Sequence, residues 1–263
     1  FALDFDYLPK LIQFREQEQS YLADCIKPLF NNSTGKNILV TGRPGIGKSA
    51  AVRFVLRELE EKGLNDKVIP IYINCWKFDT SFKIANEICE QINYKFTHNK
   101  RTDELMKVIE SYFNKKSSVI VLDEIDKLKD FDALYTLLEG IHRKTIFLIT
   151  NGKEWLINLD QRLRSRLNVE DLEFKPYNKE ETFGILNQRI EFAFVPNSFD
   201  KDAFNIIAEK CFEIGDIRMG LFLLKEAGEL AEQESSKKIT INHAKSVIEK
   251  LKNNTIKDAE EKV

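Results

Sequence analysis

The chain has 263 residues, enough for one large domain or two modest ones, of which 43% are hydrophobic and 31% charged. No uninterrupted apolar run reaches the ~20 residues that a membrane-spanning helix needs. A net charge of −2 gives no general attraction to nucleic acid, so any such contact has to come from a local patch. Four cysteines without a Cys-x-x-Cys pair and three scattered histidines predict reduced, buried thiols in a cytoplasmic protein, and no zinc site.

Strand and helix patterns alternate through the first two thirds of the chain. Strands are predicted over residues 37–41, 68–75, 118–123, 145–150 and 169–175. Helices are predicted over residues 15–30, 48–62, 81–94, 103–113 and 134–141. Almost wholly apolar strands need helices on both sheet faces, so an α/β fold with a five-stranded parallel sheet is expected.

The strand patterns stop after residue 175. Helices are predicted beyond it over residues 179–195, 200–213, 217–234 and 241–252, so a small all-α domain follows the sheet. We therefore expect a nucleotide-binding domain at 1–175, a helical lid domain at 176–252, and a polar, frayed tail at 253–263.

Residues 42–49 read Gly-Arg-Pro-Gly-Ile-Gly-Lys-Ser and fit the phosphate-binding pattern G-x-x-x-x-G-K-[ST]. The pattern lies between a predicted strand and a predicted helix, which is the context that it requires; otherwise it is an ordinary Gly-rich turn. Backbone N–H groups of such a loop face phosphate oxygens, Lys48 brings a positive charge to the β- and γ-phosphates, and Ser49 offers a hydroxyl to magnesium. We expect the nucleotide to contact Gly42, Arg43, Pro44, Gly45, Ile46, Gly47, Lys48, Ser49 and Ala50.

A second motif, Val-Ile-Val-Leu-Asp-Glu-Ile-Asp, occupies residues 119–126. Asp123 ends the predicted strand and is expected to bind Mg²⁺ together with Ser49, directly or through water. Glu124 follows, in position to orient and deprotonate an attacking water. An Asp-Glu pair in this place is otherwise a solvated strand end. The phosphate-binding loop upstream favours the catalytic interpretation, and with it ATP hydrolysis.

Asn151 follows the next predicted strand and is expected at the same sheet edge as Glu124. A polar side chain there holds the attacking water or touches the γ-phosphate. The alternative is that Asn151-Gly152 is simply a turn.

Three arginines alternate just before the last predicted strand: Arg162, Arg164 and Arg166. They either form a solvated face or include an arginine that reaches the γ-phosphate of a neighbouring subunit. Arg218, at a helix start in the all-α domain, is a candidate to close on the phosphates from within the chain.

Together these motifs resemble those of the AAA+ ATPases, and more narrowly those of the archaeal origin-recognition/cell-division-control (Orc/Cdc) replication initiators. The narrower resemblance rests on residues 7–9 and 14–17, on Tyr72-Ile-Asn74-Cys75, and on Gly215-Asp-Ile-Arg218. It implies that Leu8, Pro9 and Arg15 lie against the adenine. It also implies that Asn151 is the first sensor, Arg218 the second, and Arg162 or Arg166 the arginine finger.

The resemblance implies ATP or ADP with Mg²⁺ as cofactors, and DNA and other AAA+ subunits as partners. It implies a slowly hydrolysing initiator whose nucleotide state controls assembly on DNA. The alternatives are a clamp-loader or remodelling subunit, and a signalling ATPase that binds no DNA. A helical insertion at about 77–100 would approach DNA, by analogy with the family. Lys95, Lys100 and Arg101, with aromatic residues between them, form either a DNA-binding patch or a solvated loop.

The family carries a C-terminal winged helix, whereas only the polar residues 253–263 follow the last predicted helix here. The chain is therefore either a piece that was cut or a short, divergent member. Either case puts DNA binding by this chain alone in doubt, and leaves the expectation of ATP binding intact.

Overall fold

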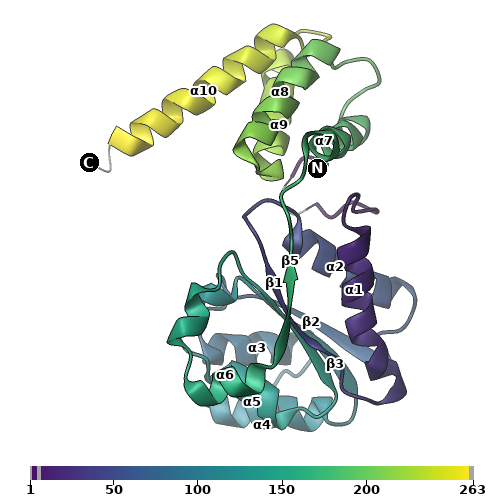
Figure 1. Cartoon of the computed structure of the whole chain (residues 1–263), viewed down its shortest axis with the longest axis vertical. Coiled ribbons are helices and arrows are strands. Elements are labelled where there is room, and N and C mark those ends of the chain that lie inside the picture. The colour runs from purple at the N-terminus through teal and green to yellow at the C-terminus, as the bar shows by residue number, and fades with distance from the viewer. Residues whose placement is uncertain (1, 5–6, 261–263) are drawn as a thin grey trace. The chain divides into compact units, whose positions relative to one another are not determined.

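The computed structural model describes residues 2–4 and 7–260 and is shown in Figure 1. Its contacts divide the chain into two compact units. The sheet unit comprises Arg15–Arg43 and Gly47–Phe174. The helical unit comprises Lys175–Val263, the N-terminal segment Phe1–Phe14 and the loop tip Pro44–Ile46, as far as these are described.

The sheet unit is built on five parallel strands in the order β2-β3-β4-β1-β5. Their bounds are β1 Asn37–Thr41, β2 Val68–Asn74, β3 Ser117–Asp123, β4 Lys144–Ile149 and β5 Val169–Glu173. Every residue of β3 and β4 is buried, which explains why these two strands read as continuous apolar runs. The predicted α/β fold with a five-stranded parallel sheet is confirmed.

Helices cover both faces of this sheet (Figure 1). They are α1 Glu16–Ile26, α2 Lys48–Glu61, α3 Ser81–Gln91, α4 Thr102–Phe113, α5 Asp132–Gly140 and α6 Gln161–Leu167. Helix α1 packs against α2, while α3, α4 and α5 pack together on the opposite side. Their apolar side chains, such as Ile84, Ile109 and Leu134, form one buried cluster with Ile71 and Ile120 of the strands.

Two parts of the sheet unit differ from the prediction. The first predicted helix changes to a 3-10 turn over Lys27–Asn31, because Pro28 has no backbone N–H to continue the α-helical pattern. Helix α6 and the 3-10 turn Glu154–Asn158 have no counterpart in the prediction. Helix α6 is short, begins at the N-cap Asp160 and ends at Asn168, whose φ of 31° is left-handed.

The helical unit contains α7 Lys179–Ala193, α8 Lys201–Ile214, α9 Ile217–Gln233 and α10 Ile241–Glu260. Asn178 and Glu181 form a capping box that starts α7. Leu3 of the N-terminal segment lies in the same apolar cluster as Leu186 and Leu224, which accounts for the grouping of that segment with these helices.

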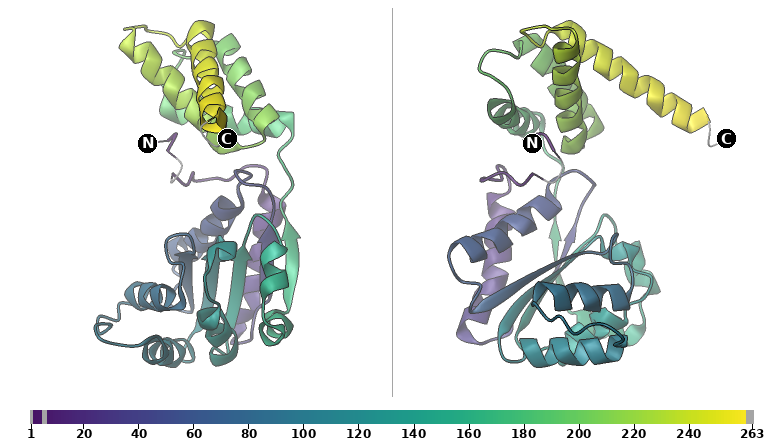
Figure 2. Two further views of the ribbon diagram at one scale, coloured as in Figure 1. Left: turned by 90° about the vertical axis from the view of Figure 1, so that its left-hand side faces the viewer. Right: turned by 180° about the vertical axis from the view of Figure 1, so that it is seen from behind.

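Helix α10 is longer than the sequence analysis predicts. It packs on α8 and α9 and then projects beyond them (Figures 1 and 2). Residues 253–260 continue it where a frayed tail is expected, because no glycine or proline interrupts the segment. The end of the predicted tail, 261–263, lies outside the described residues.

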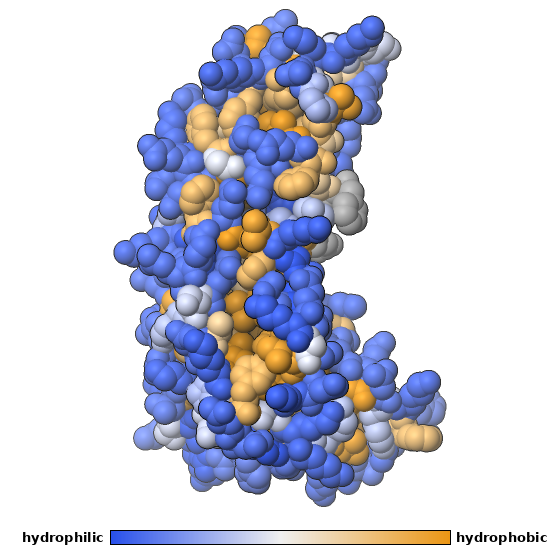
Figure 3. Space-filling model, turned by 90° about the vertical axis from the view of Figure 1, so that its right-hand side faces the viewer, coloured by the Kyte–Doolittle hydropathy of each residue, from blue (hydrophilic) through white to orange (hydrophobic). Residues whose placement is uncertain are grey.

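The face drawn in Figure 3 is largely hydrophilic at its margins, with hydrophobic side chains gathered in patches along its middle. No helix in the described part of the chain is long and apolar enough to cross a membrane. The four cysteines are buried as free thiols. Within residues 2–4 and 7–260, no group of three or more His, Cys, Asp and Glu side chains could hold a metal ion by itself.

Candidate active site

The loop over residues 42–49 joins β1 to α2, as predicted. Gly47 is the N-cap of α2 and has a φ of 90°, a conformation that L side chains rarely adopt. Gly45 has a φ of 73°, which strains any L side chain, and a Cβ built on it would lie 1.8 Å from Oδ1 of Asp216, so the Asp216 side chain would also have to shift. The backbone therefore turns sharply into the N-terminus of α2, the arrangement that presents N–H groups to an anion.

Lys48 is buried, with 6% of its surface exposed, at the first position of α2. Its Nζ donates hydrogen bonds to the carbonyl oxygens of Gly42 at 2.7 Å and Arg43 at 2.8 Å. It also donates to Oδ1 of Asn151 at 2.9 Å. The structure thus brings the expected phosphate-binding lysine and the expected first sensor into direct contact.

One of the two expected magnesium ligands, Asp123, accepts a hydrogen bond from the neighbouring strand. The Tyr72 hydroxyl of β2 donates to Oδ2 of Asp123. Asp123 is buried at the end of β3, with 4% of its surface exposed, and Ser49 follows Lys48 at the start of α2. A carboxylate and a hydroxyl are oxygen donors of the kind that Mg²⁺ prefers, so the chemistry of these two residues fits that ion.

Burial raises the pKa of Tyr72 above its ordinary value, and the charge of the neighbouring Asp123 carboxylate raises it further. The phenol is therefore protonated at neutral pH and acts as a donor to Asp123. Tyr72 is predicted only as part of the family resemblance, and its contact with Asp123 is not predicted from the sequence. A signal was present, because Tyr72 is a polar aromatic in the otherwise apolar run Val-Ile-Pro-Ile-Tyr-Ile.

Glu124 is half-buried and has a left-handed backbone, with φ 57° and ψ 46°. Non-glycine residues rarely adopt this conformation, and where they do it is often at a functional site. The turn directs the chain away from β3 immediately after Asp123, whose Oδ1 accepts a hydrogen bond from the Glu124 N–H at 2.9 Å.

Strands β3 and β4 end side by side at the carboxyl end of the sheet, where Asp123 pairs with Ile149. The following loops are joined by the Thr150 hydroxyl, which donates to Oδ1 of Asp126 at 3.0 Å. This pairing places Glu124 and Asn151 at one edge, as the sequence predicts from parallel strands.

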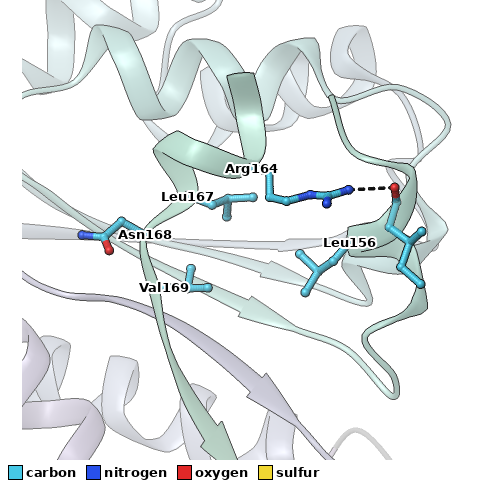
Figure 4. A pocket seen from close by; sticks show the side chains of 6 residues that line it. Leu156, Arg164, Leu167, Asn168 and Val169 are labelled. Atoms are coloured by element: carbon cyan, nitrogen blue, oxygen red, sulfur yellow. Dashed lines mark hydrogen bonds between the residues drawn. The ribbon is translucent and has the colours of Figure 1, made fainter. Parts of the chain in front are cut away.

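The three arginines before β5 have different surroundings. Arg164 donates to the Ile157 carbonyl at 2.7 Å, across a pocket of about 330 Å³ lined also by Leu156 and Val169 (Figure 4). Arg166 pairs with Glu139 and lies over the Tyr135 ring. The Arg162 guanidinium makes no hydrogen bond or ion pair with any residue that the structure describes.

The remaining expected site residues are distributed over both units. In the helical unit, Arg218 Nη2 pairs with Oδ2 of Asp216 at 2.7 Å, and the Asp216 side chain also caps the start of α9. Leu8 is half-buried and Pro9 buried, also in the helical unit.

Arg15 belongs to the sheet unit and is 4% exposed. Its guanidinium pairs with Glu18 at 3.1 Å and lies 5.2 Å from the centre of the Phe174 ring. These contacts give Arg15 a structural role in this unit. The contact of Leu8, Pro9 and Arg15 with adenine stays a prediction.

The sheet is parallel, the Gly-rich loop lies between β1 and α2, and an acidic pair stands at the end of β3. These features define a P-loop nucleotide-binding protein. Residues 31–159 match the family model described as "AAA domain", and residues 183–249 match the "Cdc6 AAA+ ATPase-type lid domain".

Among curated relatives, the chain is 34% identical over 250 residues to ORC1-type DNA replication protein 1 of Sulfurisphaera tokodaii, covering 90% of this chain and 63% of that one. It is 31% identical over 264 residues to the ORC1-type protein 1 of Archaeoglobus fulgidus, covering 95% and 64%. The Aeropyrum pernix ORC1 protein, solved in complex with DNA, superposes with a TM-score of 0.85 at 29% identity, covering 100% of this chain and 72% of that one.

The chain therefore belongs to the Orc1/Cdc6 family of AAA+ ATPases, which confirms the resemblance inferred from its motifs. It spans just under two thirds of the length of these curated relatives.

Proposed function

We propose that this chain is an initiator-type ATPase that binds ATP with Mg²⁺, hydrolyses it slowly, and uses its nucleotide state to control assembly on DNA. The observation that carries the proposal is the position of Lys48, Asn151 and Asp123 at the carboxyl end of one parallel sheet, with Ser49 next to Lys48 at the start of α2. The relatives named as DNA replication proteins, and the neighbour solved with DNA, support the initiator part. They also make the cytoplasm, on the nucleoid, the expected place of action.

The phosphates are bound by the Gly-rich loop and by Lys48. Phosphate oxygens compete with the carbonyls of Gly42 and Arg43 for the Lys48 N–H groups, so we expect these short contacts to be exchanged when ATP binds. Ser49 and Asp123 would hold the magnesium ion, which neutralises charge on the phosphates. Lys48 and Asp123 are themselves buried and hydrogen-bonded, which holds them in place before the substrate arrives and lowers the reorganisation needed for reaction.

Glu124 orients the attacking water and accepts its proton, while Asn151 holds the same water or the γ-phosphate. The rigid left-handed turn at Glu124 and the hydrogen bond between Thr150 and Asp126 fix the two loops that carry these residues. We expect slow turnover in a single chain, because positive charge from a neighbouring subunit completes the site.

Arg162 is the finger that we propose for that neighbouring subunit. Arg164 is engaged by main-chain carbonyls, and Arg166 pairs with Glu139, so each would have to break an existing contact to reach another chain. Arg162 is exposed, and its guanidinium would not have to break such a contact.

The domain assignment follows from the same proposal. We assign residues 1–175 to the nucleotide-binding domain and 176–252 to the lid, with Arg218 as the second sensor, although the contacts group the segment before Arg15 with the lid helices. DNA contact is assigned to the segment between α3 and α4, where Phe96 is 76% exposed beside Lys95. Exposed aromatic and basic side chains suit stacking on bases and pairing with phosphates.

A salt titration of duplex binding with and without ATP tests the initiator assignment. We expect the logarithm of the affinity to fall linearly with the logarithm of salt concentration, and the affinity to depend on ATP. No measurable slope, or no DNA binding by the chain in any nucleotide state, would favour the signalling ATPase.

A further inference from the structure

A tyrosine outside the nucleotide-binding motifs contacts one of the expected magnesium ligands. The Tyr72 hydroxyl donates to Oδ2 of Asp123. The other carboxylate oxygen of Asp123 accepts the Glu124 N–H. Both carboxylate oxygens of Asp123 are therefore hydrogen-bonded, Oδ2 to Tyr72 of β2 and Oδ1 to the backbone N–H of the next residue, Glu124.

Tyr72 is in turn fixed through its backbone. Strand β2 is at the edge of the sheet, so it pairs with β3 on one side only. The side-chain amide of Gln91 takes the place of a neighbouring strand at this position. Its Nε2 donates to the Tyr72 carbonyl at 2.8 Å, and its Oε1 accepts the Tyr72 N–H at 3.2 Å.

Gln91 is the last residue of α3, and the other end of that helix is also fastened to the site's loops. The Ser81 side chain and backbone N–H donate to the carboxylate of Asp130, six residues after Glu124 in the chain. The Ser81 hydroxyl also accepts the Ala133 N–H at 2.8 Å. Helix α3 is therefore attached at one end to Tyr72 and at the other to the segment that follows the acidic pair.

We propose that Tyr72 positions the Asp123 carboxylate for magnesium, and that Gln91 holds Tyr72 in the place where it does so. This inference rests on the proposed function, because it takes Asp123 as a metal ligand. Tyr72 acts through that ligand and is a positioning residue. Loss of such a hydrogen bond to a metal ligand typically costs about 10–100-fold in metal affinity or activity.

The test is Tyr72→Phe, which removes the hydroxyl and keeps the ring that lies 5.8 Å from the Arg53 guanidinium. Affinity for a fluorescent ATP analogue is measured during a Mg²⁺ titration and again in EDTA. We expect the Mg²⁺ concentration at the midpoint to rise about tenfold, while the affinity in EDTA stays within about twofold of wild type.

Tyr112→Phe is the matched control. Tyr112 lies edge-on to Phe113 in α4, and its hydroxyl makes no hydrogen bond with a residue that the structure describes. The control should leave both affinities unchanged. Gln91→Ala should shift the Mg²⁺ midpoint in the same direction as Tyr72→Phe by a smaller factor, and it decides the question if Tyr72→Phe does not fold.

Two results would overturn the inference. One is an unchanged Mg²⁺ midpoint in the folded variants, and the other is an equal loss of affinity with Mg²⁺ and in EDTA, which indicates a general structural role. Wild-type protein that binds no ATP at all would instead remove the proposed function, and this inference with it. A wild-type response to Mg²⁺ that both variants retain removes only the inference.

Discussion

The amide oxygen of Asn151 accepts a hydrogen bond from the ammonium group of Lys48 at 2.9 Å, although 103 residues separate them in the chain. Lys48 lies at the start of α2, after β1, and Asn151 follows β4, the strand that pairs with β1. Parallel pairing therefore places a polar side chain against the lysine that is expected to meet the phosphates. The contact links the phosphate-binding loop to the loop that follows the next strand.

Asn151→Ala tests what this contact contributes. We expect turnover to fall about 10–1,000-fold, because an orienting donor or acceptor at the reacting phosphate acts mainly in the transition state. The affinity for ATP should change little, since the Gly-rich loop and Lys48 still bind the phosphates. Single-turnover hydrolysis and equilibrium ATP binding measure the two effects. Asn187→Ala, an exposed asparagine of α7, is the control; a variant of Asn151 with wild-type turnover would contradict the sensor role.

Glu124→Gln separates binding from chemistry. The amide keeps the size of the side chain and cannot take the proton of the attacking water, so we expect hydrolysis to fall about 10²–10⁴-fold with ATP still bound. Phosphate release and retained nucleotide are the measurements. Glu90→Gln, at an exposed position of α3, should behave as wild type. Unchanged hydrolysis in Glu124→Gln would rule out Glu124 as the base.

The arginines of α6 are expected to differ in how they affect activity. With Arg162 acting in a neighbouring subunit, hydrolysis per chain rises with protein concentration, and Arg162→Ala removes that rise. An arginine finger contributes about 10³–10⁵ in rate in systems where it has been measured, and a partial assembly shows less. Arg166→Ala should retain the concentration dependence and lose only its ion pair with Glu139. A flat dependence in wild type would contradict action between subunits.

Burial raises the pKa of the Cys25 thiol to about 11 and that of Cys211 to about 12, from an ordinary value of 9.0. A raised thiol pKa favours the protonated form in the folded protein, so this contribution to stability is complete below pH 9 and is lost as the pH rises through 11. The folded chain should therefore resist alkylation at pH 8, where the thiolate is the reactive species.

Iodoacetamide labelling followed by mass spectrometry, with and without denaturant, measures this protection. Denatured protein is the control, in which all four cysteines should react. Labelling of Cys25 or Cys211 in folded protein at the rate of a free thiol would contradict the burial that the structure gives these residues.

The fold is largely predictable from the sequence because its strands are strongly patterned. β3 and β4 each contain a run of four apolar residues, 119–122 and 146–149, and the structure places their bounds within one residue of the predicted ones. Helix α6 is not predictable in this way, since its seven residues include three arginines and show only two buried positions. Asp160 and Asn168 are residues typical of helix ends, but a segment this short and charged shows too little apolar periodicity for them to predict a helix.

The residues of the candidate site also differ in how well the sequence predicts them. Local motifs identify Lys48, Ser49, Asp123 and Glu124, because each depends on neighbours in the chain. The contact of Tyr72 with Asp123, and the support that Gln91 gives to Tyr72, depend on strand order and on how α3 crosses the edge of the sheet. Such tertiary contacts have no sequence spacing that predicts them. The catalytic roles stay predictions until they are measured.

ATP binding by calorimetry in the presence of Mg²⁺ is the most direct measurement of the central claim. Wild-type chain and Lys62→Ala, at the opposite end of α2, should bind equally. Lys48→Ala should lose about 100-fold or more in affinity, because two charge-assisted hydrogen bonds of about 1.5–3 kcal/mol each are removed. Undiminished ATP affinity in Lys48→Ala would contradict the assignment of this loop as the nucleotide site.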